Sequence, residues 1–268
     1  MKSRIDVLLV EQGFCETREK AKRVVMAGLV FVDGQRCDKP GTGVAPDARI
    51  EVKGDDCPYV SRGGLKLQRA LDRFGLDMTG LVCLDIGSST GGFTDCMLQR
   101  GAVKVYAVDS GTNQLVWKLR SDERVVCMEQ YNFRYADPAD FADPMDFACT
   151  DVSFISLKHI LGPAAALLKD GACMVCLIKP QFEAGREQVG KNGIVRDPAI
   201  HRQAIENVLG YAADSGFSVL DLEHSPVKGT KGNIEYLVLL KKEDSPVCSV
   251  SGEQIKEAVQ KAHESLDK

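Results

Sequence analysis

Four charged residues stand at positions where they could act together on a substrate. Asp151 ends the predicted strand MDFACTD, Lys179 ends ACMVCLIK, and Glu235 opens the last predicted strand, IEYLVLL. Lys66 lies on the predicted helix that enters the same domain. Two lysines and two carboxylates in one crevice can hold each other's charge states and orient a hydroxyl. Each taken alone also fits an ordinary surface ion pair, so the hypothesis requires that they meet.

A glycine-rich turn follows the first predicted strand of that domain, LVCLDI, and leads into a helix. Glycine lets backbone approach a ligand closely, and the G-x-x-x-G-G spacing differs from the dinucleotide and P-loop fingerprints. Asp85, near the strand end, suits a ligand with an amino group, such as S-adenosylmethionine. Asp109 ends the next strand, where it can accept bonds from two ribose hydroxyls, and Asn132 is a candidate adenine contact. The turn residues expected at the cofactor are Gly87, Ser88, Ser89, Thr90, Gly91 and Gly92.

The pattern of elements predicts an α/β fold. Strands and helices alternate after residue 62, which is typical of a Rossmann-like, mostly parallel sheet with helices on both faces. A loop without a helix joins the last two strands, so we expect the last strand to be antiparallel. The expected helices are 64–74, 91–100, 113–120, 156–169 and 198–215. The glycine-rich and charged segment 183–197 is long enough to act as a substrate lid.

The first 60 residues predict a separate, small α+β unit. Ser3 and Thr17 are expected to cap helices over 4–12 and 18–27, and Asp33-Gly34 is a hairpin turn signal. We therefore expect domains over 1–59 and 60–243, followed by a polar tail over 244–268 that contains an exposed helix from Ser251.

Composition limits the function classes. No apolar run is long enough to span a membrane, and residues 1–13 lack the features of a signal peptide, which indicates a cytoplasmic protein. The ten cysteines are irregularly spaced, and the close pair Cys173 and Cys176 falls on opposite faces of a strand, so no metal site is expected. The net charge of −4 requires any nucleic-acid binding residues to be clustered locally.

The sequence resembles the TlyA family, often labelled hemolysin A, whose larger domain is similar to the FtsJ type of ribose methyltransferase. The resemblance covers roughly 4–240 and rests on VSRGGLKL, LDIGSSTGGFTDCML, AVDSGTNQL, TDVSFISL, IKPQFEAGREQVGKNGIVRDP and GNIEYLVLL. The linker reads CPYVSRG, which departs from the Arg-Ala-Trp-Val linker of some relatives, so the resemblance does not extend to any switching through that linker.

The resemblance implies a catalytic tetrad at Lys66, Asp151, Lys179 and Glu235. It also implies S-adenosylmethionine contacts at the 87–92 turn, at Asp109, and near Asp151 and Phe154. The expected reaction is 2′-O-methylation of cytidine in ribosomal RNA, on one or both subunits. We expect Lys179 to lie nearest the hydroxyl, where a lysine with a lowered pKa can accept its proton.

The N-terminal unit is similar to the RNA-binding fold named after ribosomal protein S-four. Residues 1–60 carry ten basic and ten acidic side chains and so have no net charge, which means that RNA binding would require the basic side chains to cluster on one surface. The expected contacts to RNA phosphates are Arg4, Arg18, Lys20, Lys22, Arg23 and Arg62. Taken alone, each of these residues would also fit an ordinary solvated helix face.

Three other functions remain open. A cytolysin would need a membrane-inserting segment, and none is evident. A binding protein with an inactive catalytic domain would not need both acids and both lysines. A methyltransferase for a base amino group usually carries prolines after the fourth strand, where this chain has Asp151-Val-Ser-Phe154. The modified nucleotide, the form of the RNA substrate and the oligomeric state are not given by the sequence.

Overall fold

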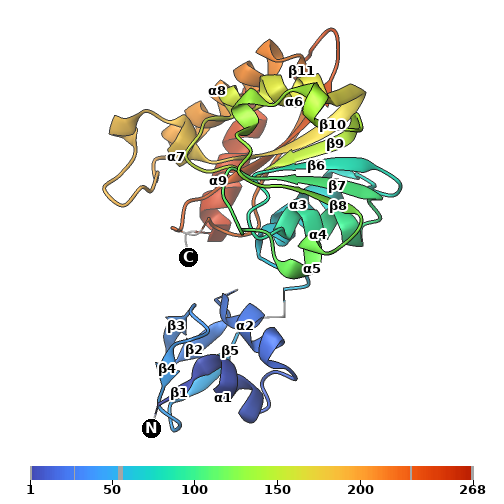
Figure 1. Ribbon diagram of the computed structural model, residues 1–268. Helices are drawn as coiled ribbons and strands as arrows, with labels where there is room; N and C mark the ends of the chain where they lie inside the picture. Colours follow the sequence, from blue (N-terminus) through green and yellow to red (C-terminus); the bar gives the residue numbers. More distant parts are fainter. Residues whose placement is uncertain (1, 27, 54–56, 230, 267–268) are drawn as a thin grey trace. The chain divides into compact units, whose positions relative to one another are not determined.

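The computed structural model describes residues 2–26, 28–53, 57–229 and 231–266, and it divides into two compact units (Figure 1). The first unit comprises residues 1–62 and the second comprises residues 63–268. Each unit has a hydrophobic core of its own and is considered separately below.

Short strands and two helices build the first unit. Its elements are β1 (Ser3–Arg4), α1 (Ile5–Glu11), α2 (Arg18–Met26), β2 (Val30–Val32), β3 (Gln35–Cys37), β4 (Gly43–Val44) and β5 (Ile50–Val52). Strand β2 pairs antiparallel with both β3 and β5, and β1 pairs with β4. The turn between β2 and β3 places Asp33 and Gly34 at φ of 51° and 80°, as a two-residue hairpin turn requires.

One helix cap in this unit was predicted correctly and one was not. The Thr17 hydroxyl accepts a hydrogen bond from the Lys20 amide at 3.2 Å, as expected for the cap of α2. Ser3 does not cap α1, because it lies in β1, paired with Val44. That pairing keeps Ser3 and Arg4 extended, and α1 begins only at Ile5.

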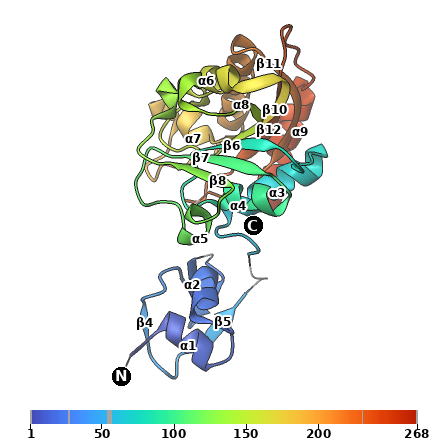
Figure 2. The ribbon, with the colours of Figure 1, turned by 45° about the vertical axis from the view of Figure 1, so that its right-hand side comes forward.

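A seven-stranded sheet forms the centre of the second unit, in the order β11-β12-β10-β9-β6-β7-β8 (Figures 1 and 2). The strands are β6 (Val82–Ile86), β7 (Lys104–Val108), β8 (Val125–Met128), β9 (Met145–Thr150), β10 (Leu168–Ile178), β11 (Phe217–His224) and β12 (Tyr236–Lys242). Strands β6 to β10 pair in parallel, whereas β12 runs antiparallel to both β10 and β11. This is the predicted α/β arrangement with the last strand antiparallel.

Helices cover both faces of the sheet. They are α3 (Gly63–Phe74), α4 (Gly92–Gln99), α5 (Trp117–Arg120), α6 (Leu161–Leu167), α7 (Pro180–Glu183), α8 (Pro198–Asp214) and α9 (Gly252–Leu266), with short 3-10 turns η1 (Phe133–Tyr135), η2 (Pro138–Asp140), η3 (Leu157–His159) and η4 (Arg186–Gln188). Residues of α6, α8 and α9 share a core with Leu84 and Ile86 of β6. Cys149 Sγ of β9 lies 3.8 Å from Met97 Sδ, so α4 covers the opposite face.

Two predicted helices are shorter than expected because local interactions replace them. The expected helix over 113–120 is helical only from Trp117, since the Glu129 carboxylate binds the amides of Asn113, Gln114 and Leu115 and holds them in a loop. The expected helix over 156–169 becomes η3 followed by α6, and β10 begins already at Leu168.

The expectation of an exposed helix in the polar tail is wrong. Helix α9 begins next to the predicted cap, Ser251, but it buries Ile255, Ala258, Val259 and Ala262 in the main core, where it packs against α8 and β11. The three- and four-residue spacing of these side chains gives the helix one apolar face. The charged residues between them dominate the composition of the segment and conceal that face.

This packing predicts that α9 contributes to the stability of the second unit. We expect Ile255→Ala to lower the free energy of unfolding by about 2–4 kcal/mol, because Ile255 is only 4% exposed and a cavity would remain. Lys256→Ala on the exposed side of the same helix is the control and should change it by less than about 0.5 kcal/mol. Denaturant unfolding measures both, and equal effects would contradict the packing role.

Candidate active site

The four residues of the expected tetrad meet in one chain of ion pairs. Lys179 Nζ lies 2.6 Å from Asp151 Oδ1, and Lys66 Nζ lies 3.3 Å from Asp151 Oδ2. The same Lys66 ammonium lies 2.7 Å from Glu235 Oε2. Lys66, Lys179 and Glu235 are buried. The ion pairs therefore connect Lys179 to Asp151, Asp151 to Lys66, and Lys66 to Glu235, and we call this row of four side chains the ion chain.

Strand direction explains why these residues meet. Asp151 and Lys179 follow the carboxyl ends of the parallel strands β9 and β10, which lie at one edge of the sheet. Strand β12 is antiparallel to β10, so its amino end, immediately after Glu235, reaches that same edge. The Asp151 amide also donates a 3.1 Å hydrogen bond to the Ile86 carbonyl at the end of β6. Helix α3 supplies Lys66.

Opposite charges close by decide the ionisation of Lys66 and Asp151. Burial favours the neutral form of Lys66, but the Asp151 and Glu235 carboxylates outweigh it and raise the pKa of Lys66. Burial likewise favours neutral Asp151, yet the two lysines hold the pKa of Asp151 below its usual range. Lys66 is thus an ammonium at neutral pH.

The segment after Asp151 carries contacts that the sequence did not reveal. Lys179 Nζ donates a hydrogen bond to Ser153 Oγ at 3.0 Å. The Glu183 carboxylate accepts hydrogen bonds from the Ser156 hydroxyl at 2.6 Å and from the Leu157 amide at 2.8 Å. Glu183, the last residue of α7, is therefore hydrogen-bonded to the segment that follows β9. Burial raises the pKa of its carboxyl.

Phe154 projects into solvent within this segment. It is 84% exposed, and its φ of 64° is unusual for a large side chain. Its ring centroid lies 5.2 Å from that of Phe182, and Lys179 Nζ lies 5.9 Å from the centroid of Phe182. Phe154, the residue expected to contact the cofactor, therefore lies on an exposed aromatic surface close to the ion chain.

The glycine turn lies directly beside Asp151. Gly87 has a φ of 83°, and a Cβ there would lie 3.0 Å from Val152 Cγ1 and 3.1 Å from the Asp151 carbonyl oxygen. A side chain at Gly91 would instead collide with Leu115 and Leu119. Gly87 thus allows the turn to lie close to the backbone of Asp151 and to Val152, whereas Gly91 leaves space for the side chains of Leu115 and Leu119. Gly92 begins α4, Ser88 is buried, and Ser89 and Thr90 are exposed.

Asp109 connects this turn to the next strand. Its Oδ2 accepts a 2.8 Å hydrogen bond from the Ser89 amide, and its Oδ1 accepts a 2.7 Å bond from the Gly111 amide. Each carboxylate oxygen has a further lone pair for a hydroxyl donor. The expected binding of ribose hydroxyls by Asp109 is compatible with this arrangement, which also fixes the shape of the turn.

Asp85 has a different environment from the one expected. It is completely buried, and its Oδ2 accepts hydrogen bonds from the Thr94 amide at 2.9 Å and hydroxyl at 2.6 Å. Burial raises the pKa of Asp85 to about 7, although the Thr94 bonds oppose the shift. A contact with the amino group of a ligand is not open to a side chain in this position, and Asp85 anchors the first turn of α4 instead.

The end of β8 holds one expected residue and one that was missed. Asn132 is exposed, and its side-chain oxygen accepts the Arg134 amide at 3.2 Å as the cap of η1. Glu129 was not anticipated. Besides binding three amides of the loop after Asp109, it pairs with Arg120 at 2.6 Å, and this hydrogen bond is the main reason that its pKa falls to about 2.

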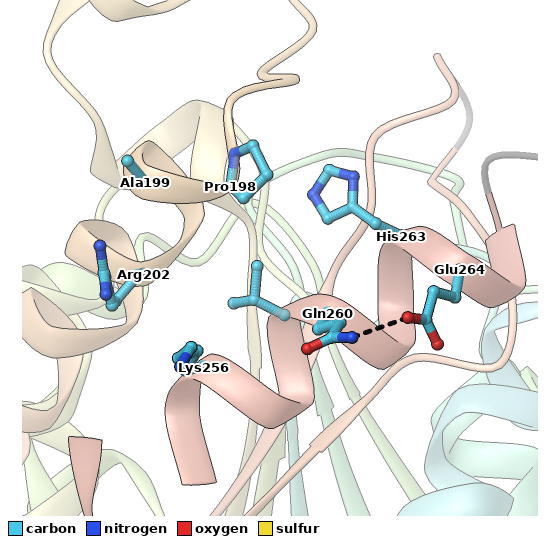
Figure 3. A pocket seen from close by; sticks show the side chains of 8 residues that line it. Pro198, Ala199, Arg202, Lys256, Gln260, His263 and Glu264 are labelled. Atoms are coloured by element: carbon cyan, nitrogen blue, oxygen red, sulfur yellow. Dashed lines mark hydrogen bonds between the residues drawn. The ribbon is translucent and has the colours of Figure 1, made fainter. Parts of the chain in front are cut away.

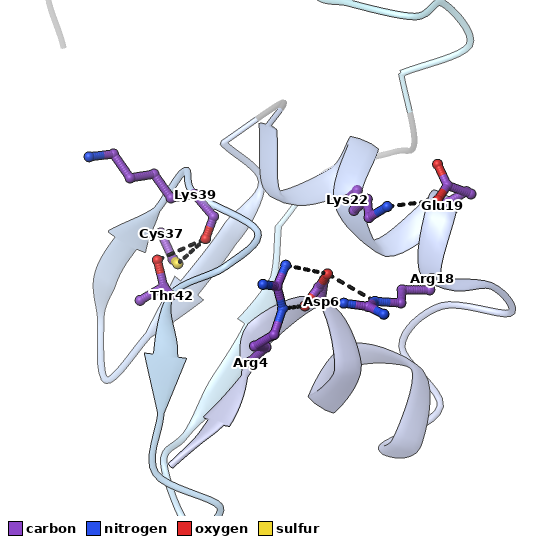
Figure 4. Close-up of polar contacts among 8 residues, drawn as sticks. All are labelled: Arg4, Asp6, Arg18, Glu19, Lys22, Cys37, Lys39 and Thr42. Carbon is purple, nitrogen blue, oxygen red and sulfur yellow. Dashed lines mark hydrogen bonds and ion pairs between the residues drawn. The ribbon is translucent and has the colours of Figure 1, made fainter. Parts of the chain in front are cut away.

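The expected RNA-binding residues of the first unit are arranged in two ways (Figure 4). Arg4 and Arg18 both bind the carboxylate of Asp6, a residue that the sequence did not single out. Lys22 pairs with Glu19 on the surface of α2 at 2.8 Å. Lys20 and Arg23 lie on the same helix, and Arg62 ends the first unit.

A pocket of about 380 Å³ lies elsewhere, between α8 and α9 (Figure 3). Its lining includes Pro198, Arg202, Lys256, Val259 and His263, and it contains none of the expected site residues. Within the described residues, no group of three or more His, Cys, Asp or Glu side chains could hold a metal ion. No helix in the described part of the chain is long and apolar enough to span a membrane.

Comparison with known families matches both units. Residues 59–242 match the FtsJ-like methyltransferase family, and residues 3–50 match the S4 domain. The first match covers the glycine turn and all four members of the ion chain. The second covers Arg4, Asp6 and Arg18.

Individual relatives align over nearly the whole chain. YqxC of Bacillus subtilis, named provisionally as an rRNA methyltransferase, is 52% identical over 99% of this chain and 95% of its own. The 16S/23S rRNA (cytidine-2′-O)-methyltransferase TlyA of Mycobacterium tuberculosis is 38% identical over 97% of both chains. A solved Streptococcus thermophilus structure, named provisionally as a hemolysin, is 56% identical, with a TM-score of 0.81 over 99% of this chain and 97% of its own.

The buried Asp85 predicts a distinct dependence of stability on pH. Its pKa is higher in the folded chain than in the unfolded one, so folding favours the protonated carboxyl, and stability falls as pH rises from about 4 to 7. Asp85→Asn keeps an oxygen acceptor and removes this dependence. We expect the Tm of the variant minus that of the wild type to increase by about 3 °C or more between pH 5 and pH 8.

Asp143→Asn is the matched control. The pKa of Asp143 is lowered, chiefly by its hydrogen bond from Lys104, so that carboxylate is ionised throughout this range. Its Tm difference should therefore be constant between pH 5 and pH 8. A constant difference for Asp85→Asn as well would show that the Asp85 carboxyl is ionised at neutral pH.

Proposed function

We propose, since this chain belongs to the FtsJ-like methyltransferase family in its TlyA branch, that it methylates the ribose 2′-hydroxyl of a cytidine in ribosomal RNA. The observation that carries the proposal is the ion chain from Lys179 to Glu235 beside the Gly87 turn. The relative from Mycobacterium tuberculosis is named for this reaction, and it aligns with nearly the whole chain.

The residues at the turn fit S-adenosylmethionine as the methyl donor. Gly87 lets the turn pack closely against the Asp151 backbone, and the Asp109 carboxylate binds the Ser89 amide of the same turn, where it can also accept ribose hydroxyls. We assign Gly87, Ser88, Ser89 and Asp109 to the donor. When bound, the donor supplies a methyl group that its positively charged sulfur makes electrophilic.

The ion chain orients the ribose hydroxyl and receives its proton. Lys179, at one end of the row of ion pairs, first releases a proton to solvent and then accepts the proton of the 2′-oxygen, and the Asp151 carboxylate stabilises the ammonium that results. Lys66 binds both Asp151 and Glu235 and so fixes the two carboxylates in place. Ser153 supplies a second oxygen that aims Lys179 Nζ.

The S4 domain supplies the affinity for RNA in this proposal. Arg4, Arg18, Lys20, Lys22, Arg23 and Arg62 provide the positive charges that contact phosphates. Ribosomal RNA or a ribosomal subunit is the substrate class, which places the reaction in the cytoplasm. The convergence of all four charged residues argues against a catalytic domain that has lost its activity.

The assigned roles predict large losses of activity. Lys179→Ala and Asp151→Ala should each reduce the methyl-transfer rate by about 100-fold or more, because each removes a group that handles the proton. The assay incubates the protein with labelled S-adenosylmethionine and separated ribosomal subunits and then maps 2′-O-methyl marks. Calorimetry with S-adenosylhomocysteine should show that Lys179→Ala still binds the cofactor product.

Lys169→Ala is the matched control, because Lys169 lies near the opposite end of the same strand, paired with Asp146 at 2.6 Å. It should keep the wild-type rate. Unchanged rates in both active-site variants would disprove the roles assigned to the ion chain. Methylation on a base instead of a ribose would disprove the proposed reaction itself.

A further inference from the structure

A completely buried carboxylate lies between the two expected RNA-binding arginines of the first unit (Figure 4). Asp6 accepts hydrogen bonds at Oδ1 from Arg4 Nε at 3.0 Å and at Oδ2 from Arg4 Nη2 at 3.1 Å. Its Oδ2 also accepts a bond from Arg18 Nε at 3.0 Å. One carboxylate thus orients two guanidinium groups that come from different elements.

The backbone fixes the position of this carboxylate. The amides of Ile5 and Asp6 donate to the carbonyls of Thr42 and Pro40 at 2.9 and 3.3 Å, and Ile5 is fully buried in the core. Asp6 cannot move toward solvent without breaking these contacts. The hydrogen bond from Arg4 is the main reason that the pKa of Asp6 lies below its usual range, so the carboxylate is ionised at neutral pH.

The arginines retain donors for a second partner. Their side chains are 52% and 53% exposed, although the Asp6 side chain is not exposed at all. In the described part of the chain, Arg4 Nη1 and both terminal nitrogens of Arg18 donate no hydrogen bond. Gly41 lies next to the Arg4 guanidinium, since a Cβ there would be 3.4 Å from Nη1. Two guanidinium groups and one carboxylate leave a net charge of +1.

We propose that Asp6 is a positioning residue that makes Arg4 and Arg18 a preformed site for one phosphate group of RNA. The proposal rests on the proposed function, because it assumes that the S4 domain binds the RNA substrate. Planar guanidinium groups bind phosphate oxygens through paired N–H donors, and a fixed orientation loses less entropy on binding. The net charge of +1 matches the single negative charge of a backbone phosphate.

The nearby pair of Glu19 and Lys22 provides a contrast on the same unit. Its N···O distance of 2.8 Å is also short, but the Glu19 side chain is 82% exposed and binds one cation. Removing either acidic residue makes the protein more positive by one charge. Simple electrostatics therefore predicts tighter RNA binding for both changes, whereas the positioning role predicts weaker binding for Asp6 alone.

The test measures the affinity of the full-length chain for a fluorescein-labelled RNA hairpin with a single-stranded loop, by anisotropy at several salt concentrations. We expect Asp6→Asn to weaken binding about 5- to 10-fold and to reduce the slope of log affinity against log salt by roughly 0.7 to 1, as one phosphate contact is lost. Glu19→Gln should bind as tightly as the wild type or more tightly.

Two further variants separate the possible results. If Arg4→Ala and Arg18→Ala bind RNA normally, the proposed RNA-binding role of this face fails. If they bind weakly while Asp6→Asn binds as well as the wild type, or better, the positioning role fails alone. In the Arg4→Ala/Arg18→Ala background, Asp6→Asn should have no further effect, and an additional loss would also overturn the positioning role.

A second variant tests the proposal even if Asp6→Asn does not fold. The double variant Arg4→Lys/Arg18→Lys keeps both positive charges and the buried carboxylate but replaces the planar guanidinium groups with ammonium groups. It should bind RNA at least 3-fold more weakly than the wild type, with unchanged affinity for S-adenosylhomocysteine. RNA binding equal to the wild type in this variant would overturn the proposal whether or not Asp6→Asn folds.

Discussion

The Lys66 ammonium, held between the carboxylates of Asp151 and Glu235, is the group on which the candidate active site depends. A buried cation or anion alone is strongly disfavoured, and Lys66 pairs with both carboxylates and helps to hold the pKa of Asp151 below its usual range. Lys66 therefore makes the negative Asp151 available, and Asp151 in turn binds and aims Lys179. The residue closest to the proposed chemistry is thus prepared by one that need not touch the substrate.

The directions of the strands bring these charged residues together. An all-parallel sheet would place the residue before β12 at the opposite edge, far from Asp151 and Lys179. The antiparallel β12 brings Glu235 to the carboxyl edge instead, where β9 and β10 end. The same edge carries the Gly87 turn and Asp109, so the charged residues and the expected cofactor residues lie together.

The sequence predicted the sheet and the tetrad because both leave local signals. Alternating apolar strands and helices identify a parallel sheet, and charged residues at strand ends stand out from it. The sequence did not show how Asp85 or Glu129 is used, because their partners share no fixed spacing or motif with them: Thr94 for one, and Arg120 with three loop amides for the other. The buried face of α9 was overlooked because the average polarity of the segment hides the spacing of Ile255, Ala258 and Val259.

The central claim concerns the charge of one side chain, which heteronuclear NMR can measure directly. With isotope-labelled lysine and Lys66→Met to assign the signal, the account predicts that Lys66 titrates above the ordinary lysine pKa. It also predicts that Glu235→Gln lowers this pKa, because one of the two carboxylates that offset burial is lost. A Lys66 pKa below the ordinary value in the wild type would contradict the account, since burial would then outweigh the two carboxylates.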